Sequence, residues 1–189
     1  MPHIDLGNDE FGIRSLLKYR PETARPMGML AEVLMRGPGT LTAGERELIA
    51  TYVSSRNECS YCTDSHAASA AVRLPGGMTQ VDQVLAGPET APITPKLAAL
   101  LRIAGAVQQN GKAVREEDVA AAREAGATDL EIHDTVLIAA AFCMFNRYVD
   151  GLATTVRPDP AGYLTAAQLN ISKGYLDTLD QSGASQQAG

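Results

Sequence analysis

The chain lacks two features that would have pointed to large partners: a long apolar run and a block of basic residues. No stretch approaches the ~18 apolar residues of a membrane span, and no basic region followed by an apolar run opens the sequence. Its 16 Lys+Arg against 22 Asp+Glu give a formal charge of −6. This balance argues against nucleic acid or an anionic membrane surface as a partner. We therefore expect a cytoplasmic protein that acts on a small molecule.

Cysteine and histidine are scarce, with three residues of each. A chain of this length can bury roughly 70% of its unfolded surface, so it needs no disulfide for stability. In a reducing cytoplasm a Cys-x-x-Cys pair is more often catalytic or metal-binding than structural. A structural zinc site takes four ligands, and no second Cys/His pair complements Cys59, Cys62 and His66, because His3 and His133 stand alone. We therefore expect no metal and no cofactor.

Strand patterns are also missing, since no segment shows sustained period-two alternation between hairpin turns. Helix start patterns recur instead. Thr42 with Glu45 forms a capping box, Thr94 precedes a proline, and Thr128 precedes a long apolar run. The predicted fold class is therefore all-α, a compact bundle of about 7–9 helices.

The chain is expected to form a single domain over residues 1–189, with flexible tails at residues 1–11 and about 180–189. A weak internal echo relates residues 45–85 to residues 96–138 at an offset of roughly 50 residues. This echo favours an internal two-fold pseudo-repeat. The proposed chemistry does not depend on it.

Two of the cysteines and one histidine fall in a single stretch, E-C-S-Y-C-T-D-S-H-A-A-S-A-A at residues 58–71. Asn57 is a suitable N-cap and the stretch contains no Gly or Pro, so we expect a helix whose first turn includes Cys59 and Cys62. The partial positive charge of a helix N-terminus favours thiolate, and thiol pKa values in Cys-x-x-Cys sites fall from about 8.5 to roughly 7 or lower. Helical spacing places His66 on the same face.

These groups suit the reduction of a hydroperoxide. A thiolate that attacks the O–O bond becomes a sulfenic acid, which condenses with a neighbouring thiol to a disulfide. An imidazole can move the proton at neutral pH, and Glu47 is the candidate carboxylate to orient His66 if the two helices pack antiparallel. Nearness to the helix N-terminus favours Cys59 as the nucleophile, whereas the neighbouring histidine favours Cys62.

The order and spacing of these residues resemble a known family. Glu47, the Cys-x-x-Cys pair twelve residues later and His66 resemble the Glu…Cys-x-x-Cys-x-x-x-His signature of the alkylhydroperoxidase D-like branch of the carboxymuconolactone decarboxylase-like superfamily. The run F-N-R-Y-V-D-G-L at residues 145–152 resembles a second motif, found in the peroxidase-related enzyme subgroup. The Pro-Lys-Leu run at residues 95–97 is similar too, and the resemblance spans roughly residues 12–155.

The resemblance implies an all-α fold, closed homo-oligomers such as a trimer or a hexamer, and cysteine-dependent reduction of hydroperoxides. It implies that Cys62 is the peroxidatic cysteine, Cys59 the resolving cysteine, and Glu47 with His66 the proton relay. It also implies a reductant of the lipoyl dithiol type or a small thiol. At Tyr61 the chain departs from the branch, in which a second histidine often precedes the second cysteine.

Two alternatives of other classes stay open. Decarboxylase or lactone-processing relatives would leave the cysteines as spectators, although such relatives typically work without a Cys-x-x-Cys pair. A redox sensor would use the dithiol only to switch conformation. Among the other polar residues, Cys143 is predicted to be a small core residue and His133 to be exposed, while Asn146, Arg147 and Asp150 are predicted to be structural.

Overall fold

The computed structural model describes residues 1–183, with side chains described through residue 176. Within that part the chain forms nine α-helices, one short 3-10 helix and no strand. In chain order the helices are α1 (Ile13–Tyr19), α2 (Pro21–Arg36), α3 (Ala43–Arg56), α4 (Ser60–Ala71), α5 (Gly77–Ala86), α6 (Pro95–Gln109), the 3-10 helix η1 (Gly111–Ala113), α7 (Glu116–Glu124), α8 (Asp129–Gly151) and α9 (Pro160–Gly183). The predicted all-α class is confirmed.

The helix starts that the sequence predicts are formed by their side chains. Thr42 accepts a hydrogen bond from the backbone N–H of Glu45, whose carboxylate accepts one from the N–H of Thr42. Thr128 and Glu131 form the same reciprocal pair at the start of α8, and Thr94 caps α6. Each cap satisfies N–H groups that the helix itself leaves unpaired. The starts of α3, α6 and α8 are thus fixed by local sequence.

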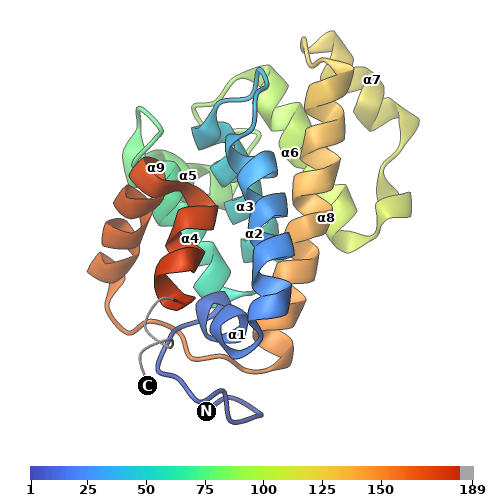
Figure 1. The fold of residues 1–189 in the computed structure, drawn as a ribbon. Coiled ribbons are helices and arrows are strands. Elements are labelled where there is room, and N and C mark those ends of the chain that lie inside the picture. Colours follow the sequence, from blue (N-terminus) through green and yellow to red (C-terminus); the bar gives the residue numbers. More distant parts are fainter. Residues whose placement is uncertain (184–189) are drawn as a thin grey trace.

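Helix α3 lies at the centre of the bundle and packs against α4, α6 and α8. Every residue from Arg46 to Ser54 is buried, so this helix has no solvent-exposed face along that stretch. A helix buried all round must be covered on every side. Helix α4 returns along α3 after a short turn, and α8 lies beside α2 on the other side (Figure 1). Any polar side chain of α3 between Arg46 and Ser54 must therefore find its partners inside the protein.

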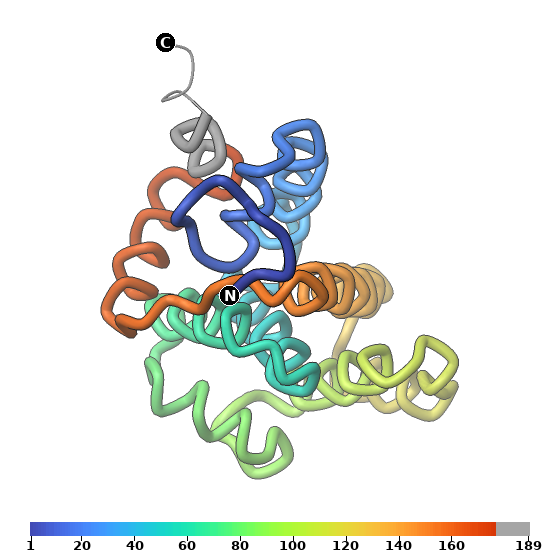
Figure 2. The backbone as a smooth tube through the Cα atoms, turned by 90° about the horizontal axis from the view of Figure 1, so that it is seen from below, coloured from blue at the N-terminus to red at the C-terminus, as the bar shows by residue number. Residues whose placement is uncertain are grey.

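Helix α9 packs against α2 and α4, and closes the bundle on the side away from α6 and α7 (Figure 2). The sequence pattern weakens from Pro158 onward and did not indicate this helix. Leu164, Leu169 and Ile171 are exposed, so the apolar residues of α9 do not gather on one face. The helix is also interrupted at Gly174, whose φ is 76°. Both features weaken the periodic pattern on which helix prediction depends.

The structure describes the whole of the first predicted tail but only the beginning of the second. Residues 1–11 run across the connection between α8 and α9, where the His3 N–H donates to the Leu152 carbonyl at 3.0 Å and Leu6 is buried. Most of the predicted tail at about 180–189 lies outside the described residues, which end at residue 183. The pseudo-repeat stays a prediction. No helix in residues 1–183 combines the length and apolar character that a membrane span requires.

Candidate active site

The turn from α3 to α4 occupies residues 57–59. Glu58 has a φ of 58°, and the Cys59 N–H donates to the Ser54 carbonyl at 3.1 Å. The prediction that Asn57 caps α4 is wrong, because α4 begins at Ser60 and Cys59 is its N-cap residue. The Asn57 side chain is engaged by α8 and α6 instead. Cys62 therefore lies in the first turn of the helix and Cys59 just before it.

Both cysteines are buried free thiols. The Cys59 thiol donates a hydrogen bond to the Cys62 sulfur, and this bond lowers the pKa of Cys62 below its ordinary value and raises that of Cys59 well above. The charge of His66 also lowers the Cys62 pKa, while burial and the Asp150 charge oppose these effects. Cys62 is therefore the sulfur that ionises first, and Cys59 stays protonated beside it.

Glu47 on α3 meets His66 on α4 across the helix pair. His66 Nδ1 lies 2.7 Å from Glu47 Oε2, and the Glu47 side chain is 1% exposed. This bond leaves His66 Nε2 available for proton transfer. The imidazole is also held edge-on against Phe142, with ring centroids 4.5 Å apart, and stacks on Tyr175 at 6.4 Å. The orientation of the imidazole is therefore fixed by three neighbours.

Tyr175 on α9 is a site residue that the sequence analysis missed. Its hydroxyl donates to Glu47 Oε1 at 2.7 Å, across 128 positions of sequence. Burial raises the pKa of Tyr175 well above its ordinary value, and the Glu47 charge adds to this, so the phenol stays protonated. No motif surrounds Tyr175 in sequence. Only the packing of α9 on α2 and α4 could have indicated it.

Asn146 on α8 lies beside the cysteines, with 1% of its surface exposed. Its Oδ1 accepts from Asn57 Nδ2 at 2.8 Å, and its Nδ2 donates to Ser54 Oγ at 3.1 Å. Asn57 is oriented in turn by Gln108 Nε2, which donates to its Oδ1 at 2.9 Å. The Asn146 amide also lowers the pKa of Cys62 by hydrogen bonding. Its role is thus electrostatic as well as structural.

Arg147 and Asp150, which share the motif at residues 145–152 with Asn146, make different contacts. Arg147 is exposed and donates to the Cys143 carbonyl at 2.9 Å, and within the described residues it forms no ion pair with Asp150. Asp150 accepts a hydrogen bond from the Cys59 thiol, which helps to raise the Cys59 pKa. Cys143 is half-buried against the main core, and His133 is exposed as predicted. The motif therefore contacts the dithiol through two of its residues.

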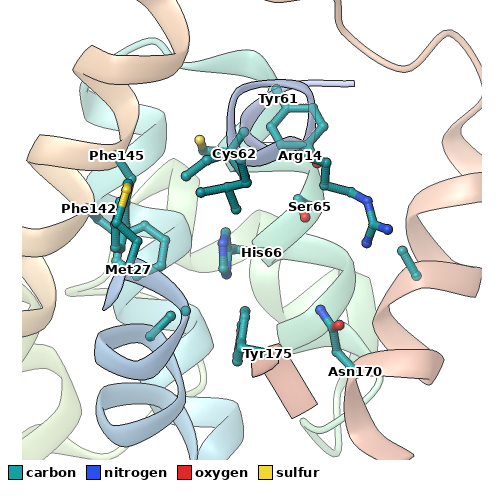
Figure 3. A pocket seen from close by; sticks show the side chains of 15 residues that line it. Arg14, Met27, Tyr61, Cys62, Ser65, His66, Phe142, Phe145, Asn170 and Tyr175 are labelled. Atoms are coloured by element: carbon teal, nitrogen blue, oxygen red, sulfur yellow. The ribbon is translucent and has the colours of Figure 1, made fainter. Parts of the chain in front are cut away.

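Cys62 and His66 line a cavity of about 120 Å³ between α1, α2, α4, α8 and α9. Figure 3 shows Met27, Phe142 and Phe145 on one side of it and Arg14, Ser65 and Asn170 on the other. Tyr61 lines the end near Cys62, and the pKa of this phenol is raised by burial. A small cavity that is mostly apolar, with a few convergent polar groups, suits a small organic molecule.

A metal centre finds no support in the part of the chain that the structure describes. No three His, Cys, Asp or Glu side chains are grouped there as ligands for an ion. The one imidazole near the thiols already uses Nδ1 for Glu47.

Comparison with known proteins identifies the family. The carboxymuconolactone decarboxylase family matches residues 21–106. A solved peroxidase-related protein from a Silicibacter species superimposes with a TM-score of 0.72 at 26% identity, over 80% of this chain and 78% of that one. An alkylhydroperoxidase AhpD core from Ralstonia eutropha, also described as peroxidase-related, superimposes with a TM-score of 0.70 at 31% identity, over 79% of this chain and 76% of that one. The curated proteins gave no match.

The chain belongs to the alkylhydroperoxidase D-like, carboxymuconolactone decarboxylase-like superfamily. The family match at residues 21–106 covers α2 to α6, and so includes Glu47, both cysteines and His66. Asn146 and Tyr175 lie beyond it, on α8 and α9. In this alkylhydroperoxidase D-like chain, two residues that contact Glu47 and Cys62 thus come from outside the matched segment.

Alkylation should distinguish the three cysteines of this alkylhydroperoxidase D-like protein. Iodoacetamide should modify Cys62 first in the folded protein, because its thiolate is stabilised and it lines the cavity. The pH midpoint of its alkylation should lie below ~8.5, the usual pKa of a thiol. Cys59 should react only at higher pH. Peptide mass spectrometry across a pH series measures each site, with Cys143 as the internal reference. Equal rates at all three sites would contradict the ionisation order.

Replacing Asn146 should change the pH midpoint of Cys62 alkylation without removing a titrating group. Asn146→Ala deletes a donor to the Cys62 sulfur, so its alkylation midpoint should rise and the rate at neutral pH should fall roughly 10-fold, the usual effect of one hydrogen bond. Asn170→Ala at the cavity rim is the matched control and should leave the midpoint unchanged. The same midpoint in both variants would assign Asn146 a purely structural role.

Proposed function

We propose that this protein is a cysteine-dependent peroxidase that reduces small organic hydroperoxides. The observation that most supports this function is the ionisable Cys62, with a protonated thiol on one side and a carboxylate-oriented imidazole on the other, at the wall of a small cavity. Both structural relatives are described as peroxidase-related, which favours the same class. A reducing cytoplasm is the compartment that suits such a dithiol.

In the first step the Cys62 thiolate attacks the terminal oxygen of the hydroperoxide. A sulfur–oxygen bond forms and the O–O bond breaks, so Cys62 becomes a sulfenic acid and an alkoxide leaves. The alkoxide takes a proton from His66, which is oriented through Nδ1 by Glu47. The apolar wall of the cavity surrounds the alkyl group, which favours an organic hydroperoxide over hydrogen peroxide.

In the second step Cys59 resolves the sulfenic acid. Its sulfur attacks the Cys62 sulfur, a disulfide forms, and the hydroxyl leaves as water with the proton of the Cys59 thiol. The contact between the two thiols places the resolving sulfur next to its target before the reaction begins. A dithiol reductant, of the lipoyl type or a small thiol, then returns both cysteines to the reduced state through a mixed disulfide.

The relay can be tested by substitution. Glu47→Gln and His66→Asn should each slow hydroperoxide turnover by roughly 10²–10⁴-fold, the usual contribution of a general acid–base group. The double variant should be little worse than either, since the two residues act as one unit. Cys62→Ser should abolish turnover, and Cys59→Ser should stop after one event with a trapped sulfenic acid.

Turnover with a hydroperoxide and a dithiol measures all five variants, and dimedone labelling detects the sulfenic acid. Losses that multiply in the double variant would contradict the relay. Full activity of Cys62→Ser on a carbon substrate would point instead to the decarboxylase or lactone chemistry of the superfamily, with the cysteines as spectators.

We also propose that the protein acts as a homo-oligomer, such as a trimer or a hexamer. Helices α2 and α8 lie side by side, and each exposes large apolar side chains to solvent. On α2, Met29 and Val33 are 50% and 67% exposed, and on α8, Leu137 and Met144 are 38% and 46% exposed. Exposed apolar side chains on two helices that pack together are typical of a surface that a second copy covers.

Light scattering tests this assembly. The wild-type protein should have a mass that is a multiple of the 20.0 kDa chain at micromolar concentration, and Val33→Glu should shift it toward one chain. Leu164→Glu, on the exposed side of α9, is the control and should leave the mass unchanged, because Leu164 lies outside the α2–α8 surface. A single-chain mass for the wild type would contradict the proposal.

A further inference from the structure

Helix α9 is broken at Gly174, and side chains of α2 hold the break on both sides. Before it, Arg36 donates to the carbonyls of Asn170 and Ile171 at 2.8 and 3.2 Å. After it, Glu32 Oε2 accepts the backbone N–H of Tyr175 at 2.7 Å. Arg36 and Glu32 are themselves paired at 2.9 Å. The two α2 residues therefore form one clamp on the broken helix.

Gly174 is required by this geometry for two reasons. Its φ of 76° lies in the left-handed region, which a residue with a Cβ rarely adopts. A Cβ at this position would also lie 2.7 Å from Glu32 Oε2, so the Glu32 carboxylate would have to shift away from the N–H of Tyr175 that it holds. The break thus depends on a glycine at position 174 and a carboxylate at position 32.

The consequence of the break is the position of Tyr175. Its hydroxyl reaches Glu47 Oε1 at 2.7 Å, while His66 Nδ1 lies at Glu47 Oε2 at the same distance. Both oxygens of one buried carboxylate are thus bonded, each from a different helix. Hydrogen bonds donated to a carboxylate favour its ionised form, and these two also fix its plane.

We propose that Tyr175 is a positioning residue of the active site: through Glu47 it holds His66 in the orientation that keeps Cys62 reactive. This inference rests on the proposed function for its catalytic meaning, but its effect on the Cys62 thiolate does not require peroxidase activity. The clamp of Glu32 and Arg36 is the device that brings Tyr175 into place.

Several charged or titratable groups surround Glu47 and His66, and among the described residues Tyr175 is the one whose side chain donates to Glu47 Oε1. Around Tyr175 these are Glu47 on α3, Glu32 and Arg36 on α2, and Arg73 after α4. Around Cys62 the groups are Cys59 and His66, with Asp150 on α8 and the buried phenols of Tyr61 and Tyr163. Arg14 on α1 lines the same cavity. A change at Tyr175 therefore reaches Cys62 through Glu47 and His66.

Tyr175→Phe tests the proposal by removing one oxygen atom. Without this donor the plane of the Glu47 carboxylate is no longer fixed, so the imidazole is held less well beside Cys62, and the thiolate loses part of the positive charge that stabilises it. The alkylation midpoint of Cys62 should therefore move to higher pH, with a roughly 10-fold lower rate at neutral pH. Hydroperoxide turnover should fall with it, and the pH dependence of turnover should shift in the same direction. Tyr19→Phe, at an exposed tyrosine of α1, is the matched control.

Gly174→Ala provides an independent variant, because it displaces Tyr175 without removing the hydroxyl. It should reproduce the shift in the alkylation midpoint of Cys62 that is expected for Tyr175→Phe, and combining the two substitutions should add little. Circular dichroism identifies any variant that does not fold, and the remaining variant then decides the outcome. An unchanged Cys62 midpoint in a folded Tyr175→Phe protein would overturn the proposal, even if thermal stability fell.

The alkylation assay also separates this proposal from the proposed function. If wild-type protein shows no turnover with hydroperoxides but Tyr175→Phe still shifts the Cys62 midpoint, the positioning role stands and the peroxidase assignment fails. If turnover is present and Tyr175→Phe changes neither the midpoint nor the pH profile, the peroxidase assignment stands and Tyr175 is only a packing residue.

Discussion

Glu47 is a carboxylate in the middle of a helix that is buried on all sides, and the rest of the site depends on how its charge is satisfied. A buried charge without donors is strongly destabilising. Here the donors come from His66 on α4 and Tyr175 on α9, both at 2.7 Å. The same bonds that make the buried charge tolerable also fix the imidazole beside the reactive thiol. Stability and function at this position therefore rest on one set of contacts, and neither α4 nor α9 can move without disturbing both.

The ionisation of Cys62 is decided by a balance between burial and donors. Burial raises the pKa of a thiol, and the nearby Asp150 charge acts in the same direction. The Cys59 thiol, the His66 charge and the Asn146 amide act against them and prevail. They prevail because each is already held by the fold, so no reorganisation is needed when the thiolate forms. In the proposed mechanism Cys59 contributes twice, since as donor it stabilises the thiolate and as neighbour it would resolve the oxidised sulfur.

The parts of this structure that sequence predicts are those determined by neighbouring residues. The caps at Thr42 and Thr128 depend on three-residue spacings, and the Glu47–His66 contact follows from two helices joined by a short turn. The start of α4 was mispredicted because Asn57, a good N-cap in isolation, bonds to residues 51 and 89 positions away. Tyr175 was missed for the same reason, since its partner is 128 positions distant and α9 lacks a clean apolar face.

The division between local and distant contacts has a functional consequence. The groups that react in the proposed mechanism, Cys59, Cys62 and His66, lie within one turn and one helix, and Glu47 lies on the helix that precedes them, all inside the segment that matches the family. The groups that adjust them, Asn146 and Tyr175, are on α8 and α9, as are Phe142 and Asn170 of the cavity wall. Changes in α8 or α9 can therefore alter thiol reactivity and the shape of the cavity while the reacting residues stay the same. In this fold, the chemistry is set by the α3–α4 pair, and its tuning by the helices that cover that pair.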